Sequence, residues 1–258
     1  MAFPTVVSGS PGYDKTATTT QKHRLGTKMT YNDGRVFYYS YAAEAITAGK
    51  VTMGSQTSSG HLTDLAVAAA AAAGANQIKL TNSTTAITGS GKYTGDFGTR
   101  GDYVDGYVFI NDHGSSGTGE GQTFTIADHS SATASGTLTI DLYDNDSVQT
   151  ALTTDSQAGI HKPVGHSVEV WDASDIDGPA LGVPTHDIAS GEYFWNQTAG
   201  PAAVLSGGTL VLGNEAYTST DGAVDPSASD NSAECRVGTV LAAAADTEYA
   251  LIDLAIKY

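Results

Sequence analysis

The sequence predicts an all-β protein with two small β-sandwich or β-barrel domains and an extended N-terminal arm. Short runs of β-branched and aromatic residues recur at roughly eight- to twelve-residue spacing, which is typical of sandwiches and barrels. Glycine-rich turn signals separate these runs. The chain of 258 residues is 40% hydrophobic and 16% charged, so it holds enough apolar material for a sizeable core.

The N-terminal part is expected to differ from the rest. Residues 1–30 have no amphipathic period and are rich in Thr, Ser, Gly and Lys, a composition that predicts an extended arm. A strong turn signal, Tyr-Asn-Asp-Gly at residues 31–34, then precedes the β-rich run 35–41. We therefore expect residues 31–53 to form a β-hairpin region that packs with either domain.

Two β domains are expected to make up the body. The first covers residues 54–160 and the second residues 166–258, with a turn-rich stretch at 159–166 between them. Residues 62–75, which contain an alanine run, are the one helix candidate, although strand-like alternation follows directly after them. The main strands of the body are expected at 107–110, 123–126, 136–143, 167–171, 193–197, 203–205, 209–212, 235–241 and 249–256.

The charge is large and unevenly distributed. Twelve Lys and Arg stand against twenty-eight Asp and Glu, a formal net charge of −16. Residues 1–100 hold nine basic and five acidic side chains, whereas residues 101–258 hold three basic and twenty-three acidic ones. A chain this acidic is repelled by phosphate, so nucleic acid is not an expected partner.

Two interpretations of this asymmetry remain open. One is a solvated acidic surface that keeps the protein soluble. The other is a mildly basic N-terminal segment that lies against the acidic body of a neighbouring copy.

Cysteine usage and hydropathy limit the protein's location. Cys235 is the single cysteine, which excludes a disulfide within the chain and a multi-cysteine metal site, and we expect it to be a small buried hydrophobe. The N-terminus lacks the basic and apolar regions of a signal peptide. The longest apolar stretch, residues 65–73, is about half of what a bilayer requires. We expect no membrane partner and a protein made in the cytoplasm.

Two glycine-rich stretches resemble phosphate-binding loops without their context. Strands are expected on both sides of residues 114–121, and Asp112 and Glu120 would repel phosphate, so a hairpin loop is predicted there. Residues 89–94 resemble the end of a Walker A motif, but Ala86 and Tyr93 stand where the motif requires Gly and Ser or Thr.

An acidic loop around Asp175 does not fit an EF-hand. The frame would begin at Ala173, which is not an acid, and would close on Pro184, where a bidentate Glu is required. Looser calcium sites stay open because crowded carboxylates favour a hard cation. The two candidate sets are Asp172, Asp175 and Asp177, and Asp141, Asp144 and Asp146.

The seven histidines suggest no catalytic group. Three of them, His113, His129 and His186, adjoin an aspartate, but neighbours on a strand point to opposite faces. His161 and His166 have no third ligand nearby in sequence. No Gly-x-Ser-x-Gly or His-Glu-x-x-His motif occurs. The sequence therefore predicts no catalytic residue, no cofactor-binding residue, no metal ligand and no enzymatic activity.

Several turn-and-strand patterns, spread over most of the chain, carry a resemblance. They are Gly106–Gly114 with Gly119–Ile126, Tyr193–Val204 with Val237–Leu241 and Ala250–Leu254, and the shorter Leu25–Thr27 and Gly34–Phe37. Together they resemble virion structural proteins of marine tailed phages, and are similar in style to head decoration (cement) proteins. The long spine helix of the common tailed-phage shell protein is absent from the sequence pattern.

The resemblance implies a protein on the capsid surface of the virion, assembled in the host cytoplasm. Its expected partners are the major capsid protein, whose neighbouring subunits it would bridge, and itself, as a homo-oligomer and plausibly a trimer. Residues 1–30 would anchor it, since an extended arm can add a strand to another subunit's sheet. The alternative is a virion-surface or tail-associated β-domain that binds host glycans through exposed aromatic residues. The available aromatics are Tyr38, Tyr39, Tyr41, Tyr193, Phe194 and Trp195.

Overall fold

The computed structural model describes residues 6–54, 59–83, 85–88, 101–112, 117–176, 178–226 and 234–257. The all-β prediction is confirmed: about 44% of the chain lies in strands, and the described residues contain no helix of seven residues or more. Their only helical elements are three single 3₁₀ turns, η1 (Tyr13–Lys15), η2 (Ser59–His61) and η3 (Thr220–Gly222). Within these ranges no helix has the length and hydropathy needed to cross a membrane.

The chain divides into two compact units. Residues Gln56–Pro163 form one, the barrel unit, while Met1–Ser55 and Val164–Tyr258 together form the other, the sheet unit. The turn-rich stretch at 159–166 therefore contains one of the two crossings between the units. The predicted hairpin region, residues 31–53, belongs to the sheet unit together with the C-terminal residues 164–258.

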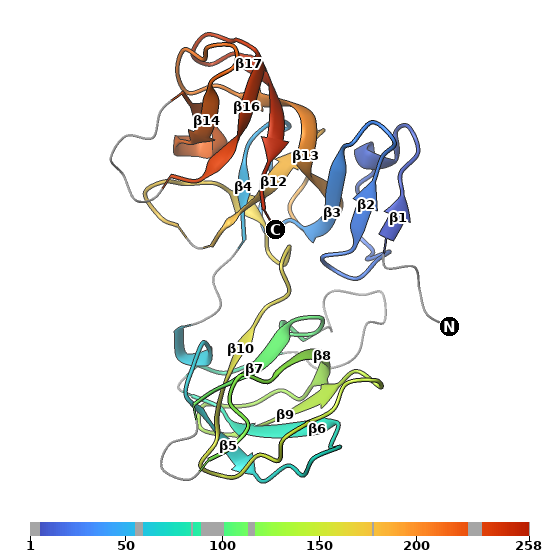
Figure 1. Cartoon of the computed structure of the whole chain (residues 1–258), viewed down its shortest axis with the longest axis vertical. Helices are drawn as coiled ribbons and strands as arrows, with labels where there is room; N and C mark the ends of the chain where they lie inside the picture. The colour runs from blue at the N-terminus through green and yellow to red at the C-terminus, as the bar shows by residue number, and fades with distance from the viewer. Residues whose placement is uncertain are drawn as a thin grey trace. The chain divides into compact units, whose positions relative to one another are not determined.

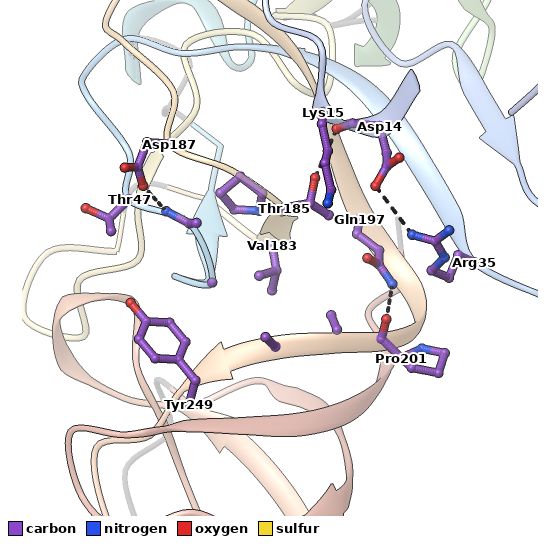
Figure 2. A pocket seen from close by; sticks show the side chains of 15 residues that line it. Asp14, Lys15, Arg35, Thr47, Val183, Thr185, Asp187, Gln197, Pro201 and Tyr249 are labelled. Atoms are coloured by element: carbon purple, nitrogen blue, oxygen red, sulfur yellow. Dashed lines mark hydrogen bonds and ion pairs between the residues drawn. The ribbon is translucent and has the colours of Figure 1, made fainter. Parts of the chain in front are cut away.

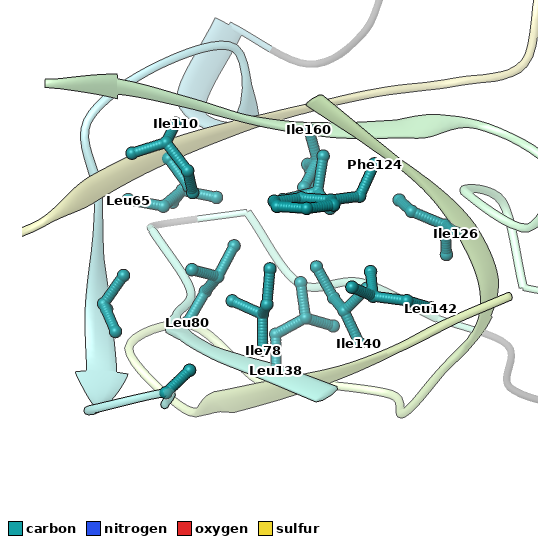
Figure 3. Close-up of a cluster of buried hydrophobic side chains, with 14 of the residues drawn as sticks. Leu65, Ile78, Leu80, Ile110, Phe124, Ile126, Leu138, Ile140, Leu142 and Ile160 are labelled. Carbon is teal, nitrogen blue, oxygen red and sulfur yellow. The ribbon is translucent and has the colours of Figure 1, made fainter. Parts of the chain in front are cut away.

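Six strands of the barrel unit form a closed barrel in the order β10-β5-β6-β9-β8-β7 (Figure 1). Along β6 and β9 every second side chain is buried, which is the pattern of strands with one face on a core. Figure 3 shows these inward side chains, among them Ile78, Leu80 and Ile140, meeting in the barrel interior. The strands are β5 (Leu65–Ala69), β6 (Gln77–Thr81), β7 (Tyr107–Asp112), β8 (Thr123–His129), β9 (Thr137–Leu142) and β10 (Gln157–His161).

The helix candidate at residues 62–75 is not a helix. Residues 65–69 form β5, in which Leu65 and Val67 are buried and the side chains between them are exposed. Gly74, with a φ of 86°, turns the chain toward β6. The alanine run favours a helix by propensity, but burial of two alternating side chains in the barrel outweighs that weak preference.

The sheet unit is built on an eleven-stranded sheet whose main path runs β1-β2-β3-β13-β17-β16-β14-β15 (Figure 1). The 13-residue β13 lies at its centre and pairs with both β3 and β17. A side branch of β4, β11 and β12 joins through β13. The strands are β1 (Val6–Ser8), β2 (Lys28–Thr30), β3 (Val36–Tyr41), β4 (Thr52–Met53), β11 (Glu169–Val170), β12 (Ala180–Pro184), β13 (Tyr193–Leu205), β14 (Glu215–Thr218), β15 (Val224–Asp225), β16 (Arg236–Ala242) and β17 (Tyr249–Ala255).

Residues 6–30 differ from the predicted extended arm, because they fold into the sheet of their own chain. Strand β1 pairs with β2, β2 pairs with β3, and the Thr18 amide donates to the Tyr193 carbonyl at 3.0 Å. The average composition of this segment hides two apolar anchors, since Leu25 is 6% exposed and Met29 is fully buried. Burial of these side chains holds the segment on the unit.

The predicted turn at residues 31–34 is confirmed as the connection between β2 and β3. Gly34 has a φ of 89°, and the Tyr31 amide donates to the Arg35 carbonyl at 2.9 Å. Cys235 lies just before β16 and is only partly buried against the core of the sheet unit. That core contains Trp171, Val204 and Ile252, all at most 1% exposed.

Candidate docking surface

An exposed apolar surface crosses the outer side of the sheet unit. Its large members are 41–66% exposed, although side chains of these types usually lie inside a protein. We call this surface the apolar face and define it as Ala203, Val211, Leu212, Leu241, Ala242, Tyr249 and Leu251.

Strand register brings these residues into one row. Ala203 of β13 lies opposite Leu251 of β17, and Leu251 lies opposite Ala242 of β16. Directly opposed residues share a face of a sheet, so the three side chains project on the same side. Their inward neighbours, such as Ala250 and Ile252, belong to the core.

A loop extends the row past β16. Residues 209–212, predicted as a strand, run without strand pairing, yet the Leu210 amide donates to Ala244 and the Gly213 amide to Val240, at 3.0 and 2.9 Å. These bonds hold the loop beside the end of β16 that carries Leu241. Val211 and Leu212, which are 52% and 66% exposed, therefore continue the apolar face.

A pocket of about 420 Å³ adjoins the apolar face at Tyr249 (Figure 2). Its lining mixes apolar groups with a polar border, as small binding sites do. The apolar part is Gly49, Val183, Pro184 and residues 201–203, and the polar part includes Lys15, Thr47, Thr185 and Asp187. Tyr249 and Ala203 line the pocket and also belong to the apolar face.

Glycine at position 49 allows the Tyr249 ring to lie where it does. A Cβ at Gly49 would stand 2.5 Å from Tyr249 Cε1, well inside contact distance, and the φ of 76° also favours glycine. The Tyr249 ring therefore rests on the turn before β4 with half of its surface exposed.

The other end of the pocket is held by an ion-pair cluster. Asp14, which is 2% exposed, accepts from the Tyr31 hydroxyl at 2.9 Å and from Arg35 Nη1 at 3.4 Å. Burial, and then the hydrogen bond to Asp14, raise the pKa of Tyr31. The Arg35 guanidinium also lies 4.5 Å from the centre of the Tyr31 ring. These contacts tie Asp14 and Arg35 together and stabilise the pocket wall.

The charge around the apolar face is negative. Asp246 and Glu248 lie in the exposed turn before β17, and Asp253 projects outward two residues after Leu251. Residues 205–256 hold eight acidic side chains and one basic side chain, Arg236. Arg236 is paired with Glu215 at 2.7 Å. The face is thus an apolar surface with an acidic border.

Most of the aromatic residues suggested for glycan binding are buried. Tyr39, Tyr193, Phe194 and Trp195 are at most 3% exposed, and only Tyr38 and Tyr41 reach intermediate exposure. Tyr39 packs on Trp195 with ring centres 5.0 Å apart, and His23 covers both rings. These rings form the core beneath residues 21–25 and offer no exposed stacking platform.

Of the two calcium candidates, the set Asp141, Asp144 and Asp146 is not grouped as a metal site, and the other set lies partly outside the described residues. Among the described residues no three acidic, histidine or cysteine side chains are grouped so that they could hold a metal ion. Asp172 accepts from the Ser174 amide and hydroxyl, contacts that lower the pKa of Asp172, and Asp177 lies outside the described residues. Asp172 and Asp175 line a second, acidic pocket of about 350 Å³.

The glycine-rich stretch at 114–121 connects β7 to β8, which pair as the predicted antiparallel hairpin. Residues 113–116 of this connection, and residues 89–94, lie outside the described residues.

The described Asp–His neighbours do not form dyads. His129 Nε2 accepts from the Tyr103 amide at 3.2 Å while Nδ1 contacts the Ser130 carbonyl at 2.9 Å, so both nitrogens are engaged by backbone. Asp187 accepts from the Ala48 amide. The ring nitrogens of His186 are buried without a hydrogen-bond partner, and burial lowers the pKa of this residue. His113 lies outside the described residues.

His161 and His166 each contact the next residue in the chain. His161 Nδ1 lies 2.7 Å from the Lys162 carbonyl oxygen, and His166 Nδ1 lies 2.7 Å from the Ser167 hydroxyl.

The apolar face was not recognised from the sequence. A signal was present, because Tyr249–Ile256 is an almost unbroken apolar run with Asp253 as its one charged residue. An antiparallel strand with a single buried face would alternate apolar and polar residues. The missing alternation indicates that the second face of β17 is apolar as well.

Comparisons with known proteins identify no relative: no family model, no curated protein and no solved structure matches this chain.

Proposed function

We propose that this chain is a virion structural protein of the capsid decoration, or cement, class. In this role it binds the outer shell, bridges neighbouring major capsid subunits and is located on the capsid surface after assembly in the host cytoplasm. Nucleic acid and membranes are not partners in this proposal, and no enzymatic step belongs to it.

The observation that carries the proposal is the apolar face. Exposed Leu, Val and Tyr side chains gathered on neighbouring strands and an adjoining loop are the kind of surface that protein–protein contacts bury. The strands beneath it are fixed by an extended hydrogen-bonded ladder, so the surface is rigid before contact. Such a surface suits a protein whose task is to hold other proteins together.

Binding to shells tests the proposal. Purified protein is mixed with particles that lack it, unbound protein is removed by sedimentation, and the bound copies per particle are counted. Saturable binding of hundreds of copies supports a decoration role. Binding of a handful of copies, or none, contradicts it and would favour a tail or fibre component.

Deletion of residues 1–30 is not a clean test of anchoring. The deletion removes β1 and β2, exposes the edge of β3 and removes the contact of the His23 ring with Trp195. We therefore expect the truncated chain to show a red-shifted tryptophan emission and a lower unfolding midpoint. Loss of shell binding by that variant would report damage to the sheet unit, so point substitutions are the better probes.

No observation favours the glycan-binding alternative, since its largest aromatics are in the core. A glycan array run with the same protein gives a separate readout. Specific binding to a polysaccharide together with an absence of shell binding would replace the decoration role by the alternative.

A further inference from the structure

We infer that the apolar face is a self-association surface, and that it is covered by the N-terminal segment, residues 6–30, of a second copy of this chain. This inference rests on the proposed assembly role and supplies its contact between copies. Self-association can nevertheless be measured without any shell, so the two ideas can fail separately.

The N-terminal segment has the opposite charge to the border of the apolar face. Residues 6–30 contain Lys15, Lys22, Arg24 and Lys28 against one acid, Asp14. Asp14 is buried and bonded to Arg35 and Tyr31, so it contributes little negative charge to the surface. Lys15 and Lys22 are exposed and Lys28 is partly exposed, so the segment presents a basic surface to solvent that complements the acidic residues around Leu251.

The same segment also carries exposed apolar side chains. Val6 is 46% exposed and Tyr13 is 43% exposed. Val6 lies opposite Lys28 in the pairing of β1 with β2, so an apolar and a basic side chain stand next to each other. The segment thus offers exposed apolar side chains among basic ones, which suits an apolar face with an acidic border.

The segment does not reach the main part of the apolar face within its own copy. Strands β1 and β2 form one end of the sheet path, and β3 and β13 separate them from β17 and β16. Lys15 reaches only the pocket that adjoins the face at Tyr249. Leu241, Leu251 and Leu212 lie farther along the path, so a second molecule must supply the complementary surface.

This arrangement calls for a closed oligomer. The two complementary surfaces lie at different places on one sheet, so each copy gives one and receives the other, either reciprocally in a two-fold dimer or head to tail in a heterologous contact. Heterologous contacts form a ring when the rotation between copies closes. We expect a closed oligomer whose mass is a fixed multiple of 26.4 kDa.

The first test changes the centre of the apolar face. Mass in solution is measured by light scattering and sedimentation equilibrium for the wild type, Leu251→Asp and Tyr107→Asp. Leu251 and Tyr107 are both 41% exposed on strands, but Tyr107 belongs to the barrel unit. Leu251→Asp should weaken association by at least about tenfold, as at the centre of an interface, whereas Tyr107→Asp should leave it unchanged.

The second test exchanges charges and does not depend on a core change. Lys22→Glu with Lys28→Glu, and separately Asp246→Lys with Asp253→Lys, should each weaken association by at least about tenfold. The chain with all four substitutions should recover it, because the charges are again opposite. Tryptophan emission and near-UV circular dichroism verify that each variant is folded.

Three outcomes overturn the inference: a wild-type monomer at all concentrations, an oligomer that ignores both charge exchanges, or a quadruple variant that stays dissociated. Shell binding is scored independently. A wild-type monomer that decorates shells ends this inference and leaves the proposed function standing. An oligomer that responds to the charge exchanges but never binds shells supports this inference and contradicts the proposed function.

Discussion

The two units bury their cores in similar ways but differ in what they show to solvent. The strand path of the barrel unit closes on itself, whereas the sheet unit has an open path with β1 and β15 at its ends. Of the nine large hydrophobic side chains that are exposed among the described residues, Tyr107 alone belongs to the barrel unit. The other eight belong to the sheet unit.

Strands β6 and β17 make the difference concrete. Both alternate exposed and buried residues along their length. The outward residues of β6 are Gln77, Lys79 and Thr81, while those of β17 include Tyr249 and Leu251. The inward residues place each strand on its core, while the outward residues are polar on β6 and largely apolar on β17. Under the proposed function, the sheet unit is therefore the part that contacts other proteins.

The largest expected effect is on the barrel core. Leu80→Ala removes a fully buried side chain, and the cavity left behind should cost about 2–5 kcal/mol of unfolding free energy. Both tryptophans, Trp171 and Trp195, belong to the sheet unit, so tryptophan fluorescence reports that unit alone. In urea unfolding, far-UV circular dichroism should show an earlier barrel transition while the fluorescence transition keeps its midpoint.

Lys79→Ala is the matched control, because Lys79 is the exposed neighbour of Leu80 on the same strand. It should change the unfolding free energy by less than about 0.5 kcal/mol. An equal shift of both transitions in Leu80→Ala would show that the two units unfold together and are not independently stable.

A smaller effect is expected at the pocket. Gly49→Ala strains a positive φ and drives a methyl group into the Tyr249 ring, so we expect a loss of about 1–3 kcal/mol in the fluorescence-detected unfolding free energy. Gly213→Ala is the control, since its φ of 82° is similar but no atom lies within 4 Å of the added Cβ. Equal losses in the two variants would mean that backbone strain, and not contact with Tyr249, limits position 49.

The smallest effect is a pH dependence confined to the sheet unit. Burial lowers the pKa of His186, so below the ordinary value of 6.5 the unfolded chain takes up a proton before the folded chain does. Stability is therefore fully present above pH 6.5 and falls as the pH decreases toward the folded pKa. His186→Gln should flatten this decline in fluorescence-detected unfolding between about pH 7.5 and 5.5. His161→Gln is the control, because His161 belongs to the barrel unit, which the tryptophans do not report. An unchanged slope in His186→Gln would show that His186 does not cause the pH dependence.

Several barrel strands were predictable because their signals are local, although β5 was expected to be helical and β10 overlaps the stretch 159–166 that was expected to be a turn-rich boundary. Alternation in Gln77–Thr81 and Thr137–Leu142, with turn residues between strands, requires no knowledge of partners. The N-terminal segment was not predictable in this way. Leu25 and Met29 become anchors only because β3 brings aromatic residues next to them, and β3 in turn depends on pairing with distant β13.

The apolar face shows a similar limit. Its members come from β13, β16, β17 and a loop, and no sequence window contains all of them. The aromatic cluster at 193–195 was more conspicuous in the sequence, yet burial makes it part of the core. A surface is defined by register between strands, and register between distant strands cannot be derived from one sequence by periodicity alone.

The barrel unit is inserted into the sheet unit, since the chain leaves the sheet unit after residue 55 and returns at residue 164. During synthesis the N-terminal residues leave the ribosome first, and domains generally fold as units once they have emerged. All residues of the barrel unit have been synthesised once residue 163 is made. Tyr41 of the sheet unit, in contrast, pairs with Tyr193, which is synthesised much later. The closed unit is thus complete early on the ribosome. The apolar face cannot form before β17 has been made, so it appears only after the closed unit.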